Sequence, residues 1–457
     1  MKNKRFLISV LILTLLPVHI LMASVLPTQA FLGVAGPIGN VESSDGAIIE
    51  RVFPGGTGEM LKLQAGDLIK KVNDVEIKNF QHLIAVLKNI IVGQEINISG
   101  LRDKKFIELA GVLMARPQEQ GNTAFDVIYD SVKVNNSQLR SIIYRPKSSK
   151  EDQKFPALYF IQGYTCASID YGLYPNSTGN KVLQSIADAG YVVYKIEKFS
   201  VGDSIGDIQC SEINFTTELT GFIAGLKALK SYDFVDGNNI HLFGHSLGGV
   251  YAPFIARQST VKSLISYGSV VKPWFDYIQD IYLRQALIFG TSKVQAVLNS
   301  KTVTPLLKAW LKTDEPWSEI IADKQYQTAL TSQLIPVSGD QVFHRHYTFF
   351  RDLNDYDLAK AWQETTSNVL AIHGSLDIQA IDEGWATQMV AMAKKDGIKV
   401  KRVILEGAEH GFMRYESMAN YLEARNDRSY NPMQPGNGYD PRVAETIINW
   451  LNSLSKS

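Results

Sequence analysis

The segment Asn239-Ile-His-Leu-Phe-Gly-His-Ser-Leu-Gly-Gly249 is the clearest indication of fold and chemistry in this chain. An apolar strand runs directly into a glycine-flanked serine turn, and a helix-like stretch follows over Val250 to Arg257. A serine at a sharp strand-to-helix turn presents its hydroxyl to a cleft, and the next backbone N–H points at an oxyanion that forms there. The segment therefore predicts an α/β domain in which Ser246 is a nucleophile and Leu247 N–H is an oxyanion donor.

The partners that a nucleophilic serine needs follow downstream. The stretch from Ser367 to Asp377 is typical of a buried strand ending in a polar turn, which puts Asp377 at the carboxyl edge of a parallel sheet. A further predicted strand, Val400 to Leu405, leads into the loop Gly407-Ala-Glu-His-Gly-Phe412, which carries His410. The chain order serine, aspartate, histidine is that of α/β-hydrolases.

These three segments resemble the catalytic motifs of the α/β-hydrolase superfamily, with most similarity to its dienelactone-hydrolase and prolyl-oligopeptidase-like branch. The resemblance covers about residues 125–455. It implies a mostly parallel sheet with helices on both faces. It also implies Ser246 as nucleophile, His410 as general base, and Asp377 as the residue that orients the imidazole. Asp382 is the alternative acid, but Asp377 follows the strand directly.

A second oxyanion donor is expected after an early strand, in Phe155-Pro-Ala-Leu-Tyr-Phe-Ile-Gln-Gly-Tyr164. Members of the superfamily usually carry His-Gly at this turn, whereas this chain has Gln162-Gly163. The exchange leaves the backbone donor available, so the resemblance implies Tyr164 N–H beside Leu247 N–H as the oxyanion hole.

The N-terminus has the pattern of a secretory signal peptide. Met1 to Arg5 is basic, Phe6 to Val18 is apolar, and small residues follow. The pattern predicts a signal peptide over residues 1–30 that is cleaved after Ala30, with cleavage after Ala23 as the alternative. The apolar run is shorter than the roughly 20 residues of a bilayer span, so we expect an exported, periplasmic or secreted chain without membrane insertion after cleavage. An uncleaved anchor is the minority interpretation.

The following segment resembles a bacterial PDZ domain. Leu63-Gln-Ala-Gly-Asp-Leu-Ile-Lys-Lys-Val-Asn73 matches the Gly-Asp-x-Ile-x-x-Val-Asn pattern of that family, and Phe31-Leu-Gly-Val34 resembles its carboxylate-binding loop. The resemblance implies a small β-rich α+β domain over residues 31–114 that binds a peptide as an added strand. The residues expected to line the groove are Leu32, Gly33, Val34, Leu83 and Leu87. The alternative is that the two helix leucines are ordinary core and the hydrolase domain closes the groove.

The remaining organisation follows from breaks in the pattern. Residues 115–124 are predicted to be a polar linker, and residues 125–457 the hydrolase domain. After the predicted strand Ser263–Tyr267 the strand–helix alternation stops for roughly 100 residues, longer than any ordinary connection. We expect this insertion, at about residues 271–366, to form a helical lid over Ser246 that shapes the substrate pocket.

Two pairs of side chains in the lid invite functional hypotheses. His344 and His346 alternate, but without a third ligand they favour lid packing over a metal site, so no metal is expected. Arg345 or Arg351 is a candidate to hold a substrate carboxylate.

The two cysteines, Cys166 and Cys210, are an even pair in a chain expected to be exported, which favours a disulfide over two free thiols. Both loops are expected at the carboxyl edge of the sheet, so a bridge would clamp the rim of the site. Basic and acidic residues balance at 46 each, which gives no electrostatic reason to expect nucleic acid as a partner.

Together these observations predict an exported serine hydrolase that cleaves a carboxylic ester or related acyl bond through an acyl-Ser246 intermediate, without a cofactor. The expected partners are a small ester or short peptide substrate at the hydrolase, and a peptide C-terminus or extended peptide at the PDZ domain. Two alternatives stay open. One is a serine peptidase of prolyl-oligopeptidase type, and the other is a PDZ-based binding module with an idle hydrolase fold.

Overall fold

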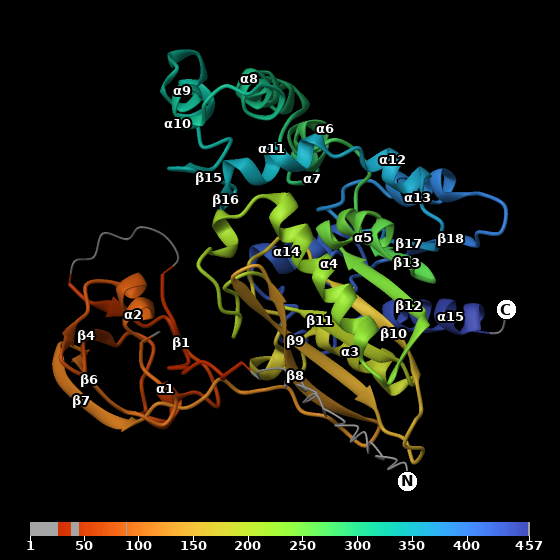
Figure 1. Ribbon diagram of the computed structural model, residues 1–457. Coiled ribbons are helices and arrows are strands. Elements are labelled where there is room, and N and C mark those ends of the chain that lie inside the picture. The colour runs from red at the N-terminus through yellow and green to blue at the C-terminus, as the bar shows by residue number, and fades with distance from the viewer. Residues whose placement is uncertain (1–25, 38–44, 88, 456–457) are drawn as a thin grey trace, which may run out of the picture.

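The computed structural model describes residues 26–37, 45–87 and 89–455. Most of the predicted signal peptide therefore lies outside the described residues. The described part forms a small β-rich domain, a larger α/β domain, and a helical insertion beside the sheet of the α/β domain (Figure 1). None of the helices described is both long and apolar enough to cross a membrane.

The N-terminal domain is an antiparallel sheet with one helix packed against it. Its sheet runs in the order β2-β4-β6-β7, with β5 paired to β4, while β1 and β3 form a separate two-stranded ribbon. The elements are β1 (Val34–Ala35), β2 (Ala47–Ile48), β3 (Arg51–Val52), α1 (Thr57–Met60), β4 (Leu68–Val72), β5 (Val75–Glu76), α2 (Phe80–Leu87), β6 (Glu95–Arg102) and β7 (Lys105–Val112). Alternate side chains of β6, Ile96 and Ile98, are fully buried against Leu83 of α2, as the two-residue period of a strand requires.

The second domain contains an eight-stranded sheet in the order β18-β17-β13-β12-β10-β11-β9-β8. The strands are β8 (Phe125–Val134), β9 (Ser137–Pro146), β10 (Phe155–Ile161), β11 (Val192–Ile196), β12 (Val235–His245), β13 (Ser263–Tyr267), β17 (Asn368–Gly374) and β18 (Val400–Leu405). Neighbouring strands pair in parallel with two exceptions: β11 pairs antiparallel with β9, and β9 pairs antiparallel with β8. The mostly parallel sheet and the β-rich domain before it confirm the predicted fold class.

Helices cover both faces of this sheet. One face carries α3 (Thr178–Asp188) and α15 (Arg442–Ser455), and the other α4 (Phe215–Ser231), α5 (Leu247–Gln258) and α13 (Gly384–Ala393). The side chains of strand β10 alternate between these two faces. Leu158 and Phe160 pack on the face that carries α3 and α15, while Tyr159 and Ile161 pack on the face that carries α4, α5 and α13. A strand buried on both faces has to be apolar throughout, which is the pattern of this segment.

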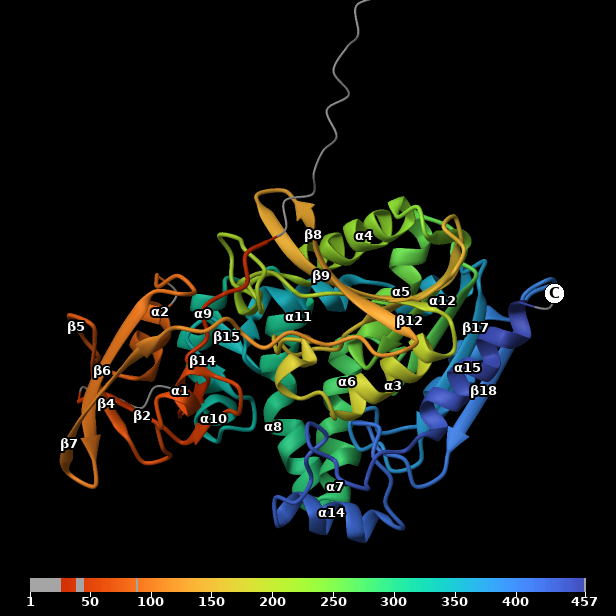
Figure 2. The same cartoon turned by 90° about the horizontal axis from the view of Figure 1, so that it is seen from below.

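The insertion between β13 and β17 forms the lid. It is mainly helical, with a small antiparallel sheet of β14 (Val337–Ser338), β15 (Gln341–Val342) and β16 (Arg345–His346). Its helices are α6 (Trp274–Asp280), α7 (Ala286–Ile288), α8 (Lys293–Lys312), α9 (Trp317–Ala322), α10 (Gln327–Thr331), α11 (Tyr347–Asp355) and α12 (Leu358–Gln363). Figure 2 shows the β-rich domain at one side of the molecule and α15 with β18 at the opposite side.

The connection between the domains is anchored by buried polar contacts. Glu119 accepts hydrogen bonds from the Lys195 ammonium, at 2.6 Å, and from the hydroxyl of Tyr144. Lys195 and Glu119 are almost completely buried. The rings of Phe53 and Tyr174 also meet across the two domains, with their centroids 5.9 Å apart. The segment predicted as a polar linker is thus packed against the α/β domain.

Candidate active site

Ser246 occupies the turn between β12 and α5. Its backbone, at φ 56° and ψ −126°, is a conformation that non-glycine residues rarely adopt, and its N–H donates to the Tyr267 carbonyl at 2.9 Å. The flanking glycines permit this turn. A Cβ on Gly244 would lie 2.4 Å from the Gly248 carbonyl, and one on Gly248 would lie 2.0 Å from the Ile161 oxygen. The tight turn leaves the serine side chain in a pocket.

His410 and Asp377 form a buried pair at the same pocket. His410 Nδ1 lies 2.8 Å from Asp377 Oδ2, and the other carboxylate oxygen accepts the N–H groups of Gln379 and Ala380 at 2.9 Å each. Burial opposes ionisation of Asp377, but the histidine and the hydrogen bonds outweigh it and hold the pKa of Asp377 below its usual value. Burial likewise favours neutral His410, but the charge of Asp377 outweighs it, so the pKa of His410 is raised.

The alternative acid and the neighbouring histidine have other partners. The Asp382 carboxylate is paired with the Arg284 guanidinium at 2.7 Å. His245 Nε2 lies 2.8 Å from the carbonyl oxygen of His410, and burial lowers the pKa of His245 to about 3. His245 thus supports the loop of His410 as a neutral side chain.

Two backbone donors lie beside the serine. Among the described residues, the Tyr164 N–H has no acceptor, and Leu247 is the first residue of α5, where a helix leaves its N–H unpaired. Gly163 packs closely against the serine: a Cβ on this glycine would lie 2.9 Å from the Cβ of Ser246. Gln162, the residue that replaces the usual histidine, is buried and donates a long hydrogen bond of 3.5 Å to the Ile196 carbonyl.

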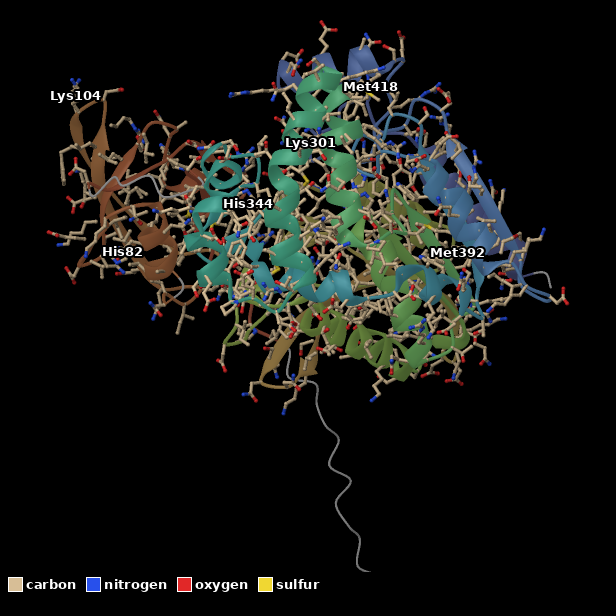
Figure 3. The ribbon with its side chains drawn as sticks, turned by 90° about the horizontal axis from the view of Figure 1, so that it is seen from above. His82, Lys104, Lys301, His344, Met392 and Met418 are labelled. Carbon is tan, nitrogen blue, oxygen red and sulfur yellow. A yellow bond between two sulfur atoms is a disulfide. The ribbon has the colours of Figure 1, made fainter. Side chains whose placement is uncertain are left out.

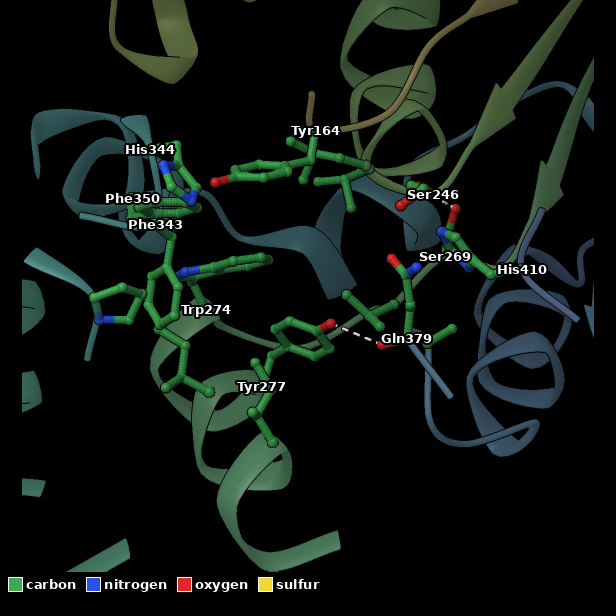
Figure 4. Close-up of a pocket in the computed structure, with 18 residues that line it drawn as sticks. Tyr164, Ser246, Ser269, Trp274, Tyr277, Phe343, His344, Phe350, Gln379 and His410 are labelled. Atoms are coloured by element: carbon green, nitrogen blue, oxygen red, sulfur yellow. Dashed lines mark hydrogen bonds between the residues drawn. The ribbon is translucent and has the colours of Figure 1, made fainter. Parts of the chain in front are cut away.

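The pocket in front of Ser246 is small and aromatic, with a volume of about 290 Å³. Figure 4 shows Ser246 and His410 at one end and Phe343, Phe350 and His344 at the other. Its aromatic lining consists of Tyr164, Trp274, Tyr277, Phe343 and Phe350. The rings of Trp274 and Phe350 stack with centroids 5.0 Å apart, which gives the pocket a flat apolar wall.

The lid extends from this pocket toward the β-rich domain. His344 is exposed and lies on the side of the lid nearer that domain, and Lys301 lies on the long lid helix α8 (Figure 3).

The lid arginines do not line this pocket. Arg345 is buried and bonds to the Tyr164 carbonyl and to Glu218, while Arg351 donates to the carbonyls of Trp310 and Glu315. Arg345 thus ties the lid to the α/β domain, and Arg351 bonds within the lid, so neither guanidinium lies in the pocket as the hypothesis of a carboxylate contact requires. Sequence reasoning also missed Glu218 and Lys198, which complete the Arg345 cluster, because nothing in the local pattern distinguishes them from surface charges.

The lid histidines, His344 and His346, do not belong to a cluster of metal-ligating side chains among the described residues. His346 Nδ1 bonds to the hydroxyl of Thr348 at 2.7 Å. No group of three metal-ligating side chains occurs in the part of the chain that is described.

The two cysteines are joined by a disulfide, with Cα atoms 5.9 Å apart. Cys166 follows the Tyr164 turn, and Cys210 begins the short helical turn (Cys210–Glu212) that precedes α4. The bridge thus ties the loop beside the serine to the loop that leads into the neighbouring helix.

The predicted peptide groove borders a cleft between the two domains of about 550 Å³. Leu32 and Leu83 belong to the core of the small domain but also border the cleft, as do Gly33, Val34 and Leu87. The opposite wall comes from the α/β domain and consists of Ser200, Ser204, Ile205, Gly206 and Gln209. The groove is thus open, and the α/β domain forms one wall of the cleft that it borders.

Both domains have similarities to known proteins. The sequence model of the PDZ domain family matches residues 22–99. Esterase EstD of Thermotoga maritima is 19% identical over 298 residues, which cover 65% of this chain and 62% of that protein, so the chain spans less than two thirds of this relative's length. A probable periplasmic serine protease do/HhoA-like protein of Haemophilus influenzae is 32% identical over 81 residues, which cover 18% of this chain and 17% of the relative. Among solved structures, Est1E from Butyrivibrio proteoclasticus is 17% identical and covers 72% of this chain and 99% of its own, with a TM-score of 0.43.

Proposed function

We propose that this chain, which joins a PDZ domain to an α/β-hydrolase domain, is an exported serine hydrolase that cleaves small carboxylic esters. The observation that carries the proposal is the buried His410–Asp377 pair, at 2.8 Å, in the same pocket as the strained Ser246 turn. A strained serine backbone is costly to maintain, and both backbone strain and perturbed histidine pKa values cluster at active sites. The name of the Thermotoga relative, an esterase, supports the same reaction class.

The reaction would follow the acyl-enzyme route. Ser246 Oγ attacks the ester carbonyl while His410 Nε2 takes its proton, and the oxyanion receives the N–H groups of Tyr164 and Leu247. The C–O bond to the alcohol then breaks, and His410 returns the proton to the departing oxygen. Water, deprotonated by the same nitrogen, then attacks the acyl-Ser246 ester. The bond between the acyl carbon and Ser246 Oγ breaks, His410 returns the proton to Oγ, and the carboxylic acid is released. Asp377 holds the histidine in the required tautomer throughout.

The pocket favours an uncharged acyl group over a peptide. Among the described residues that line it, none is an aspartate, glutamate, lysine or arginine, so it offers no fixed charge for a peptide terminus or a charged side chain. Its volume of about 290 Å³ and its flat aromatic wall suit a short or planar apolar acyl group. A serine peptidase of prolyl-oligopeptidase type is the second candidate within the same chemistry.

The PDZ domain is proposed to bind a peptide strand in the cleft between the domains. Val34 of β1 borders this cleft, and the paired edge of β1 faces β3, which leaves the opposite edge toward α2 for an added strand. Titration of the chain with a labelled library of C-terminal peptides tests this binding. Saturable binding of a subset would support it, and uniform failure would leave the domain a structural role.

Hydrolysis of acetyl, butyryl and octanoyl p-nitrophenyl esters, with the Ser246→Ala variant as control, tests the enzyme. Turnover that vanishes in the variant and declines from butyryl to octanoyl would support a small-ester hydrolase. Equal rates in both proteins would overturn the assignment of Ser246. Faster cleavage of peptide p-nitroanilides than of the esters would favour the peptidase, and inactivity on both kinds of substrate would favour the binding module.

A further inference from the structure

A buried charge cluster lies directly behind the Gly163–Tyr164 turn. The carboxylate of Glu218, on α4, accepts hydrogen bonds from Lys198 Nζ at 2.8 Å and from Arg345 Nη2 at 2.7 Å. The hydroxyl of Tyr251 donates a third hydrogen bond to it at 3.0 Å. No more than 1% of any of the three charged side chains is exposed. Burying charges is costly and is repaid only in part by pairing and hydrogen bonds, and the proposed mechanism so far uses none of these groups.

The two cations of this cluster bind the backbone of the turn. Lys198 Nζ donates to the Gly163 carbonyl at 2.6 Å, and Arg345 Nη1 donates to the Tyr164 carbonyl at 2.9 Å. The Gly163 carbonyl belongs to the same peptide group as the Tyr164 N–H. In a trans peptide the C=O and N–H bonds point in opposite directions, so a cation fixed on the carbonyl also fixes where the N–H points.

We propose that Lys198 is a positioning residue of the oxyanion hole, which aims and polarises the Tyr164 N–H by binding the Gly163 carbonyl of the same peptide group. This inference rests on the proposed function. Glu218 and Arg345 hold the ammonium in place, and Arg345 carries the restraint into the lid. A charged donor on the carbonyl draws electron density from the amide and strengthens its N–H as a donor.

Lys198 also places a positive charge beside the turn, where negative charge develops on the substrate oxygen. Loss of a whole oxyanion donor costs roughly 10²–10³ in kcat in other serine hydrolases. A misdirected and less polarised donor should therefore cost about tenfold to a hundredfold in kcat, with little effect on KM.

The chain supplies a matched control in Lys195. Its side chain is also fully buried, pairs with Glu119 at 2.6 Å and donates to the Ile169 carbonyl at 2.7 Å, without a contact to the oxyanion turn. Replacing either lysine by methionine removes one buried ammonium. In the Lys198→Met variant, Glu218 keeps Arg345 and the hydroxyl of Tyr251, so no carboxylate is left unpaired.

The test compares the full mature chain with its Lys198→Met and Lys195→Met variants, using p-nitrophenyl butyrate and an aryl boronic acid that mimics the tetrahedral intermediate. Active sites are counted by covalent labelling with a fluorophosphonate. We expect Lys198→Met to lose at least tenfold in kcat per labelled site, to keep KM within about twofold, and to lose boronate affinity in parallel. Lys195→Met should keep kcat per labelled site. Equal kcat in the two variants, or a loss confined to KM, would overturn the role of Lys198.

The wild-type pH profile is a second measurement that needs no folded variant. Burial lowers the pKa of Lys198 to about 8. The positive charge of Arg345 also lowers this pKa, whereas the negative charges of Glu218 and Glu197 raise it. Tyr251 also faces the cluster, but burial raises its pKa, so it stays neutral. We expect kcat to fall above pH 8 as Lys198 loses its proton. A flat profile up to pH 10 would contradict this expected loss of the Lys198 charge, whereas a wild type no faster than Ser246→Ala would refute the esterase function on which the proposal rests.

Discussion

Gly268 lies so close to Asp377 that a Cβ on the glycine would come within 2.5 Å of Asp377 Oδ2. The same atom would lie 2.9 Å from His410 Nδ1. The glycine thus faces the hydrogen bond between the aspartate and the histidine, and its φ of +60° already favours glycine. The proposed catalytic pair depends on the absence of a side chain at this position.

We predict that Gly268→Ala lowers kcat by about tenfold or more, because the methyl group displaces the carboxylate or the imidazole from their contact. The matched control is Gly290→Ala. Gly290 also has a positive φ, of +84°, but has open space around its Cβ position, so this variant carries the backbone strain alone. Kinetics on p-nitrophenyl butyrate and thermal melts of both variants check the prediction. Equal losses of kcat in both would contradict it.

The pH dependence on the acid side should report His410. Activity requires the neutral imidazole, and the charge of Asp377 raises the pKa of His410 despite burial, so the acid limb should lie above the ordinary histidine value of about 6.5. Asp377→Asn removes that charge and should move the acid limb to lower pH while kcat falls on the order of 10³–10⁴. Profiles of kcat from pH 5 to 8 test both shifts. An acid limb that does not move in Asp377→Asn would refute the pairing.

The Cys166–Cys210 disulfide should stabilise the fold. The two cysteines are 44 residues apart in sequence, and closing a loop of that length lowers the entropy of the unfolded chain by an amount equivalent to about 4 kcal/mol. The double Cys→Ser variant should therefore melt several degrees lower, and dithiothreitol should lower the melting temperature of the wild type but leave that of the variant unchanged. Titration of two free thiols in the native protein would contradict this prediction.

Processing of the N-terminus should leave residues 26–30 on the mature chain. The carbonyl of the buried Leu26 accepts Arg140 Nη2 at 2.5 Å, and the N–H of Gln29 donates to Asp203 at 2.9 Å. Cleavage after Ala30 would remove both contacts, so the packing favours the upstream site after Ala23. N-terminal sequencing of the processed protein checks this, and a mature chain that begins at Phe31 would contradict it.

Much of the fold can be predicted because its strands are buried on both faces and its helices alternate with them. The strands Ser263–Tyr267 and Val400–Leu405 begin and end where the apolar runs indicate. Helix α3 begins at Thr178, because the Ser177 side chain accepts the Asn180 N–H and caps it.

Part of the candidate site could likewise be predicted from the sequence, and part could not. Ser246, Asp377 and His410 each follow a strand, so chain order and the carboxyl edge of the sheet predict that they lie close together. The cluster of Lys198, Glu218 and Arg345 had no such signal, because its members come from three distant segments that only the folded chain brings into contact.

The ion pair between Glu119 and Lys195 also bears on how the protein can be shortened. A truncation that begins at residue 125, where similarity to hydrolases starts, would remove Glu119 and leave the fully buried Lys195 ammonium without its counter-ion. An orphaned buried charge of this kind costs roughly 3–5 kcal/mol, a large part of the stability of an ordinary domain. The smallest autonomous catalytic unit therefore starts upstream of Glu119, within the segment that a sequence comparison would discard as a spacer.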